Sequence, residues 1–410
     1  MTRWTSIGVT AVLILSALFP WIFAAVANHG LLHIAPEFAD DSGYYYAQVH
    51  DVAAGYPFIG NPYFKEYVNE PATSFFGADW VAAVPLLVGI PIVPSTIIDL
   101  LIAFGIFGGL LIALARMLGM RRLWIFVCLV AVVSTSYWLM ERPVSMQIVF
   151  PCFLFFLLSY LAWLKNPHAR PAQISLVISS ALSFYIYTYL WQIVVIVFGL
   201  THAWLLLRER KRFISLLWID AAIAALALPV LWYTYMQLHL AWYWPTIIRA
   251  GFVETHTFGS SAIIVAMITI TMLVAVWVLC NDRAKRHAEL TFIGVTGISI
   301  LIASFSNVIT GKDLETAIHF IRFSYLWSAI AGSYALFVFF EGRSFDWHRD
   351  ILSRYGICII GIIAFLGFNL YQTLEGFPST VSSSMLASQA YAAPLRWLEE
   401  YAGGLSYFCG

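Results

Sequence analysis

Two adjacent carboxylates, Asp40 and Asp41, stand in the stretch Ala-Asp-Asp-Ser-Gly-Tyr-Tyr-Tyr that begins at residue 39. Adjacent carboxylates near a bilayer repel each other, so either one keeps a raised pKa or both share a cation. A carboxylate of this kind can act as a general base toward an acceptor hydroxyl. A bound metal would be a divalent ion such as Mg²⁺ or Mn²⁺, held by this pair with His256. The alternatives are a solvated acidic loop, or Asp40 as the cap of a helix over 44–53.

Basic and polar side chains gather in a second stretch, over 307–322, which contains Asn307 and Lys312. His319 and Arg322 are three residues apart, so they share one face of a helix. A cationic pair at a lipid interface suits a phosphate, which arginine binds through two nitrogens and lysine as a point charge. The alternative is that these side chains reach toward lipid headgroups, as basic residues near helix ends do.

Two further stretches carry candidate substrate contacts. Asn61 and Tyr63 belong to a Gly-Asn-Pro-Tyr turn followed by Glu66, whose other role would be to fold the loop back onto the membrane. The aromatic stretch 237–258 includes Trp244, Arg249 and His256. Flat rings stack on sugars, but they also form the aromatic belt of membrane proteins. Both readings stay open.

The elements that position these residues follow from the composition. Of the 410 residues, 61% are apolar and 11% are charged, whereas a soluble domain carries about 25% charged residues. Apolar runs of about 20 residues recur along the chain, which is the length of a membrane-spanning helix. Since the runs do not alternate apolar with polar residues, a barrel is excluded. We therefore predict an all-α integral membrane protein of about eleven spans.

The predicted spans leave long segments on one side of the membrane. They cover 5–26, 95–115, 122–140, 144–164, 172–188, 190–207, 213–235, 260–280, 288–306, 319–340 and 351–372. The aromatic cluster at 185–191 is expected to break 172–207 into two spans, and the proline-rich segment 78–93 to form a short broken helix. The bundle then covers 1–372 and includes an external loop, 28–77. A short external tail, 373–410, ends abruptly, as expected of a piece of a longer protein.

The basic residues predict the orientation. With a cytoplasmic N-terminus, 16 of the 22 lysines and arginines fall in inside segments and six in outside ones, which is the bias that cytoplasmic loops show. The C-terminus is then external, and the tandem aspartates and the 307–322 stretch share the non-cytoplasmic side. We expect the inner (cytoplasmic) membrane of a bacterium as the location.

Several functional classes are excluded or left without support. The formal net charge is zero and no basic stripe is present, so no nucleic-acid partner is expected. The five cysteines show no metal-ligand spacing. Two carboxylates, Asp99 and Asp220, fall inside spans, where such groups are functional or paired with a partner.

Taken together, these features resemble the GT-C superfamily of membrane glycosyltransferases. Asp40-Asp41 followed by Tyr44 is similar to the Asp-Glu-x-x-Tyr pattern of the lipid A aminoarabinose transferases and related mannosyltransferases. Asp41 stands where those families have Glu. The Gly-Asn-Pro-Tyr turn and the stretch from Asn307 to His319 resemble a bacterial branch of the superfamily whose members are mostly unassigned.

The resemblance implies inverting transfer of a hexose or pentose from a polyprenyl-phosphate donor to a lipid or glycan acceptor outside the cytoplasm. Asp40 and Asp41 would be catalytic. The resemblance assigns the donor phosphate and the substrate to two sets of residues: Lys312, His319, Arg322 and Arg249 for the phosphate; Tyr44, Tyr45, Asn61, Tyr63, Glu66, Trp244, His256 and Asn307 for the substrate. None of the sequence motifs requires a cofactor. A secondary transporter, a lipid-linked glycan polymerase or flippase, and a membrane acyltransferase are the alternatives.

Overall fold

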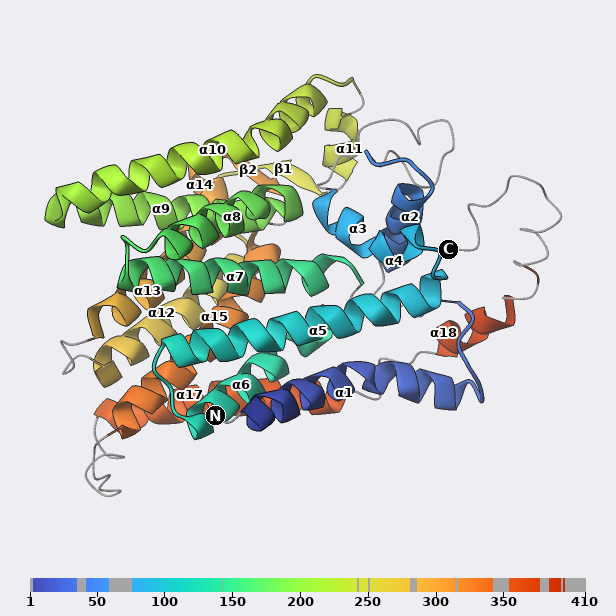
Figure 1. The fold of residues 1–410 in the computed structure, drawn as a ribbon, viewed down its shortest axis with the longest axis horizontal. Helices are drawn as coiled ribbons and strands as arrows, with labels where there is room; N and C mark the ends of the chain where they lie inside the picture. The colour runs from blue at the N-terminus through green and yellow to red at the C-terminus, as the bar shows by residue number, and fades with distance from the viewer. Residues whose placement is uncertain are drawn as a thin grey trace. The chain divides into compact units, whose positions relative to one another are not determined.

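The computed structural model describes residues 3–34, 42–58, 76–141, 143–241, 243–249, 251–280, 286–314, 316–341, 354–376, 383–391 and 394. These residues form helices and one two-stranded sheet (Figure 1). The elements are α1 (Arg3–Ala27), α2 (Ser42–Ala53), α3 (Gly77–Ala82), α4 (Val84–Leu87), α5 (Ile92–Met117), α6 (Arg122–Glu141), α7 (Ser145–Lys165), α8 (Arg170–Ile186), α9 (Thr188–Arg208), α10 (Arg210–Leu238), α11 (Tyr243–Arg249), β1 (Phe252–Glu254), α12 (Ser260–Cys280), α13 (His287–Ser304), α14 (Ser306–Thr310), β2 (Lys312–Leu314), α15 (Thr316–Phe340), α17 (Arg354–Gly376), α18 (Ser383–Ser388) and the 3-10 turn η4 (Gln389–Tyr391).

The chain divides into two compact units. Unit 1 comprises Met1–Gly109, Tyr137–Pro151 and Gln372–Gly410, and unit 2 comprises Leu110–Ser136 and Cys152–Tyr371. Each of the eleven predicted spans coincides with a helix. In the described part of the chain, seven helices are long and apolar enough to cross a membrane: α5, α7, α9, α10, α12, α13 and α15. The helical membrane class is therefore confirmed, and the count of eleven crossings stays a prediction.

Helix α15 forms the core of unit 2. It packs against α12, α13 and α9, and its large side chains Phe320, Phe323, Trp327 and Tyr334 are fully buried. Of the seven long apolar helices in the described chain it is the most deeply covered, with 89% of its most apolar stretch buried. Contact with α13 is close because Gly297 there faces the Trp327 ring directly. Small residues at helix crossings allow this approach within membranes.

The predicted break within 172–207 is present. Helix α8 ends at Ile186, Tyr187 is extended (φ −162°, ψ 128°), and α9 begins at Thr188. The segment 78–93 is broken as predicted: Pro85 stands in the first turn of α4, and Gly89 has a positive φ of 85°. Proline fits the first turn of a helix without losing a hydrogen bond, and glycine adopts positive φ without strain, so these two residues separate the short helices from α5.

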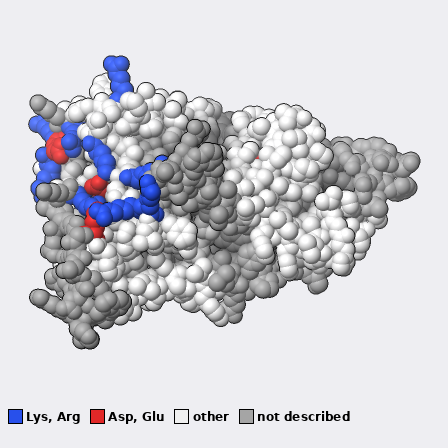
Figure 2. All heavy atoms as spheres, turned by 60° about the horizontal axis from the view of Figure 1, so that its bottom comes forward, with Lys and Arg blue, Asp and Glu red and all other residues white. Residues whose placement is uncertain are grey.

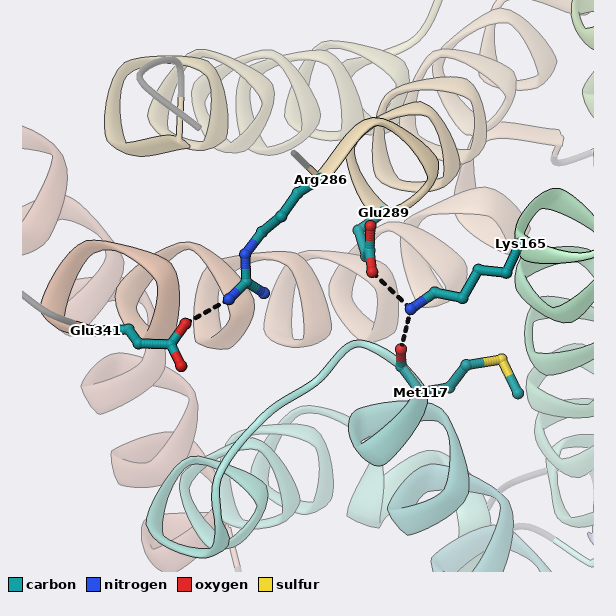
Figure 3. A network of polar contacts seen from close by, with 5 residues as sticks. All are labelled: Met117, Lys165, Arg286, Glu289 and Glu341. Atoms are coloured by element: carbon teal, nitrogen blue, oxygen red, sulfur yellow. Dashed lines mark hydrogen bonds and ion pairs between the residues drawn. The ribbon is translucent and has the colours of Figure 1, made fainter. Parts of the chain in front are cut away.

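Charged side chains tie several helix ends of unit 2 together. The Lys165 ammonium lies 2.5 Å from a Glu289 carboxylate oxygen and donates a hydrogen bond of 2.6 Å to the Met117 carbonyl. Arg286 pairs with Glu341 (Figure 3). These contacts join the ends of α5, α7 and α15 with the start of α13. Each ion pair neutralises two charges at partly buried positions. Removing one partner there lowers the free energy of unfolding more than it would at a fully exposed site.

This charged network supports the predicted alternation of the helices. The distribution of basic residues assigned Arg121, Lys165 and Arg286 to the same side of the membrane. Glu341 pairs with both Arg121 and Arg286, and Lys165 pairs with Glu289, three residues after Arg286. These contacts place the three basic residues at the same end of unit 2. Figure 2 shows lysine and arginine side chains gathered on this surface with a few carboxylates among them. Whether this end faces the cytoplasm stays a prediction.

Candidate functional site

A two-stranded sheet joins the aromatic stretch to the polar stretch. Strands β1 and β2 are antiparallel, with Val253 opposite Asp313 and Glu254 opposite Lys312. Loops were predicted over both stretches, and this short sheet was not predicted; the rest of the described chain is helical, as expected. Strand pairing was missed because three-residue strands carry no periodic signal, and their hydrogen bonds come from a segment about 60 positions away.

The sheet holds several predicted residues close to one another. The Lys312 ammonium lies 5.7 Å from the centre of the Trp244 ring, a cation–π distance. The His256 ring shares a 2.9 Å hydrogen bond with the Val308 carbonyl, and the Asn307 amide donates to the Thr257 carbonyl at 2.7 Å. Asn307 is buried, so its amide fixes the two loops together. Its direct contact with substrate stays a prediction, whereas Lys312, Trp244 and His256 are exposed.

Gly311 is required by the geometry of this corner, since its φ is +68° and a Cβ there would lie 2.8 Å from His256 Nε2. We expect Gly311→Ala to lower the free energy of unfolding by about 1–2 kcal/mol, from the left-handed backbone alone. Displacement of the His256 ring would add to this. Thermal unfolding in detergent measures the loss. Gly259→Ala is the matched control, because its Cβ meets nothing within 4 Å; equal melting temperatures for the two variants would refute the argument.

A second cluster surrounds His319 near the start of α15. The Tyr187 hydroxyl shares a 2.6 Å hydrogen bond with His319 Nδ1, and the Tyr189 ring stacks on the imidazole at 4.1 Å. Tyr187 is the extended residue between α8 and α9, and Tyr189 is in the first turn of α9. When the hydroxyl donates to Nδ1, the ring proton stands on Nε2 as a second donor. The aromatic signal at 185–191 was read as a membrane-interface turn, and its contact with His319 was not predicted.

Arg322 lies one turn beyond His319 on α15. Its Nη1 is buried and has no hydrogen-bond partner among the described residues. A guanidinium nitrogen taken out of water without an acceptor costs more than a neutral group would. Within the described part of the chain, this nitrogen therefore has room for an accepting group that the neighbouring residues do not supply.

Some of the remaining predicted residues lie in the described part of the chain, and the others lie outside it. Tyr44 and Tyr45 lie on α2 in unit 1, where the Tyr44 hydroxyl accepts a 2.8 Å hydrogen bond from Gln48. Several predicted positions lie outside the described residues: Asp40, Asp41, Asn61, Tyr63, Glu66 and the side chain of Arg249. The catalytic assignment of the tandem aspartates therefore stays a prediction.

Two acidic residues of unit 1 are buried, unlike the side chains of a solvated loop. Asp51 on α2 and Asp79 on α3 are 2% and 3% exposed, and each has a carboxylate oxygen without a hydrogen-bond partner among the described residues. Burial raises the pKa of Asp51 to about 6 and that of Asp79 to about 7. The acidic loop was expected to be solvated unless it had a function. In the structure, α2 packs on α3 and α4, and this packing removes the two carboxylates from water. Sequence spacing alone could not show this packing.

The intramembrane carboxylate Asp220 has a partner that sequence reasoning did not find. His202 Nε2 on α9 makes a short hydrogen bond to Asp220 on α10. The edge of Phe213 meets the imidazole, with the two ring centres 5.1 Å apart. Pairing of this kind is how a membrane protein accommodates an ionisable group. Asp99 lines a pocket in unit 1 and is considered below.

No set of three or more histidine, cysteine, aspartate or glutamate side chains in the described segments is arranged to hold a metal ion. The proposed pair Asp40 and Asp41 is outside those segments, so the Mg²⁺ or Mn²⁺ prediction stays untested. The fold and contacts define a multi-pass helical membrane protein with a cationic, aromatic-lined site. Comparison with models of protein families and with curated proteins gives no match.

Proposed function

We propose that this protein is a membrane glycosyltransferase that moves a sugar from a polyprenyl phosphate to a hydroxyl-bearing lipid or glycan acceptor. One observation carries the proposal: the Arg322 guanidinium presents a buried nitrogen with no acceptor among the described residues. A phosphate supplies that acceptor. It also carries the negative charge that a buried guanidinium requires, and arginine matches its geometry.

Neighbouring groups support an anion at this position. His319 is oriented by Tyr187 and Tyr189, which fixes the direction of its second ring nitrogen. Lys312, seven residues before His319 in the sequence, is exposed. A lipid-borne phosphate suits this setting because α15 starts close to these groups and then runs through the apolar core of unit 2. The hydrocarbon tail would lie along helices while the phosphate stays at their polar end.

The proposed reaction is a direct displacement. Asp40 takes the proton of the acceptor hydroxyl, the resulting oxygen attacks the anomeric carbon of the sugar, and the bond from that carbon to the phosphate oxygen breaks. Polyprenyl phosphate leaves with the bonding electron pair. Its charge increases as it leaves, so Arg322 and His319 stabilise the transition state more than the donor. Trp244 provides a flat face against which a sugar ring can stack.

Binding of a polyprenyl phosphate tests the anion site without knowledge of the sugar. We expect Arg322→Gln to weaken binding about 10- to 100-fold, from the loss of charge-assisted hydrogen bonds. Binding to purified protein in detergent can be followed by native mass spectrometry. Arg208→Gln is the matched control, because Arg208 is exposed at the far end of α9. Unchanged affinity in Arg322→Gln would remove the main support for a phosphate donor.

Asp40 tests the chemical step separately. In proteoliposomes supplied with labelled polyprenyl-phosphate sugars, we expect Asp40→Asn to lose at least about 100-fold in transfer rate, the contribution of a general base. Its affinity for polyprenyl phosphate should stay the same, because the phosphate is assigned to other residues. Full transfer by Asp40→Asn would show that another group accepts the proton.

A secondary transporter remains a second candidate, favoured by the paired His202 and Asp220 within the helices of unit 2. Transporters place ionisable pairs along ion pathways. Loss of substrate uptake in His202→Gln vesicles, with phosphate binding unaffected by Arg322→Gln, would favour transport.

A further inference from the structure

A small pocket lies within unit 1, among α2, α4, α5 and the start of α7. Its polar lining consists of Tyr46, Thr96, Asp99 and Gln147, and Leu86 and Val144 contribute apolar walls. The interior has room for about one water-sized group. A sugar ring or a headgroup does not fit this volume, so its occupant must be a water or a small ion.

Two of the lining groups have no partner among the described residues. Gln147 is 6% exposed, and its amide makes no hydrogen bond to any described residue. The Asp99 carboxylate likewise makes no ion pair or hydrogen bond within the described segments. Among the described residues, no lysine, arginine or histidine lines the pocket. An unpaired carboxylate and an unpaired amide facing the same small space leave a negative charge and free oxygen acceptors to be satisfied.

We propose that this pocket binds a monovalent alkali cation, with Na⁺ as the expected ion. The oxygens that line the pocket are all hard: the Asp99 carboxylate, the Gln147 amide carbonyl, the Tyr46 hydroxyl, and the Thr96 hydroxyl, whose proton is donated to the carbonyls of Ile92 and Val93. A single carboxylate balances one positive charge, whereas Ca²⁺ and Mg²⁺ sites draw on more carboxylates or on phosphates. A water molecule could bond to Gln147, but it would not balance an ionised Asp99, which has no cationic partner among the described residues.

The backbone supports a formed site. Val144, directly before α7, has a φ of +63°. This conformation is rare for a β-branched residue and persists where the surrounding structure enforces it. Val144 lines the pocket itself, as does Gln147 in the first turn of α7. The N-terminus of α7 carries a partial positive charge of about half an elementary charge, which opposes a cation, and an ionised Asp99 would outweigh it.

A bound cation would connect α2, α5 and α7 at one point. Helix α2 begins one residue after the predicted catalytic pair, so the ion would hold that segment against the spans. The inference does not depend on the proposed transfer, because it concerns ion binding alone.

Thermal unfolding of the purified protein tests the site directly. Melting temperatures are measured in NaCl against N-methylglucamine chloride at constant ionic strength, with a titration of tryptophan fluorescence as a second readout. We expect a saturable rise of about 3 °C in Na⁺, since a ligand that binds only the folded state stabilises it by mass action. Equal melting temperatures in both salts at all concentrations would overturn the proposal.

Two variants locate the effect. Asp99→Asn and Gln147→Leu should each abolish the Na⁺-dependent rise and the fluorescence change; the second keeps the test valid if the first fails to fold. Glu254→Gln, an exposed carboxylate on β1, should retain both responses. A Na⁺ effect that survives in Gln147→Leu, and in Asp99→Asn where it folds, would place the ion elsewhere and refute this site.

Discussion

Gly297→Ala is expected to destabilise the protein by about 1–3 kcal/mol, the usual cost of forcing an added methyl group into a packed core. The new Cβ would overlap the Trp327 ring, lying 2.7 Å from its Cη2 atom. Trp327 is 1% exposed within the central helix, so the ring has no free space to enter. Gly297→Val should cost more, and a failure to accumulate in the membrane is the expected result.

The matched control for this prediction is on the same helix. At Gly294 a Cβ meets nothing within 4 Å, so Gly294→Ala should be neutral or stabilising by up to about 1 kcal/mol through helix propensity. Thermal unfolding in detergent compares the two. Adding Trp327→Leu to Gly297→Ala should recover part of the loss, since it removes the overlapping ring. A Gly297→Ala variant as stable as Gly294→Ala would show that the α13–α15 contact is looser than described.

Asp79→Asn is expected to stabilise the protein at pH 8 and to give no gain at pH 4. Burial raises the pKa of Asp79 from 3.8 to about 7, so the folded state holds its proton more tightly than the unfolded state. Stability from this group is therefore complete below about pH 3.8, falls as the pH rises toward 7, and stays low above it. The difference corresponds to about 4 kcal/mol.

Replacing the carboxyl group with a neutral amide removes the cost of burying a charge above pH 7. The amide keeps an unpartnered polar atom, which costs about 1–3 kcal/mol, so a net gain of about 1–3 kcal/mol is expected at pH 8. Melting temperatures between pH 4 and pH 9 give the profile, which should be flatter in the variant. Glu254→Gln, at an exposed position, should leave the profile of the parent protein unchanged. A variant with the parent's full pH dependence would show that Asp79 is not its source.

Much of the helical architecture could be predicted because each span is encoded locally. A membrane helix satisfies its own backbone hydrogen bonds, so about 20 apolar residues in a row leave few alternatives. Local signals also predicted the interruption at Tyr187 and the short helices around Pro85. The basic residues predicted which helix ends lie together, and the pairing of Lys165 with Glu289 agrees with that prediction.

The candidate site could be predicted in residue type but not in its contacts. The spacing of His319 and Arg322 showed that they share a helix face, and nothing local indicated that Tyr187, 132 positions away, would orient His319. Asp51 and Asp79 have the sequence surroundings of a solvated loop, and only packing of α2 on α3 and α4 buries them. The role of Asp40 and Asp41 rests on sequence and resemblance alone.

The sequence by itself determined that this chain is a bundle of membrane helices with polar groups concentrated at their ends, because hydrophobic length and charge act within each segment. Only the tertiary structure decided which polar groups meet, which are buried and which lack a partner. The physical reason is that the cost of burying Arg322, Asp79 or Gln147 depends on atoms supplied by distant segments, and no local pattern specifies those atoms.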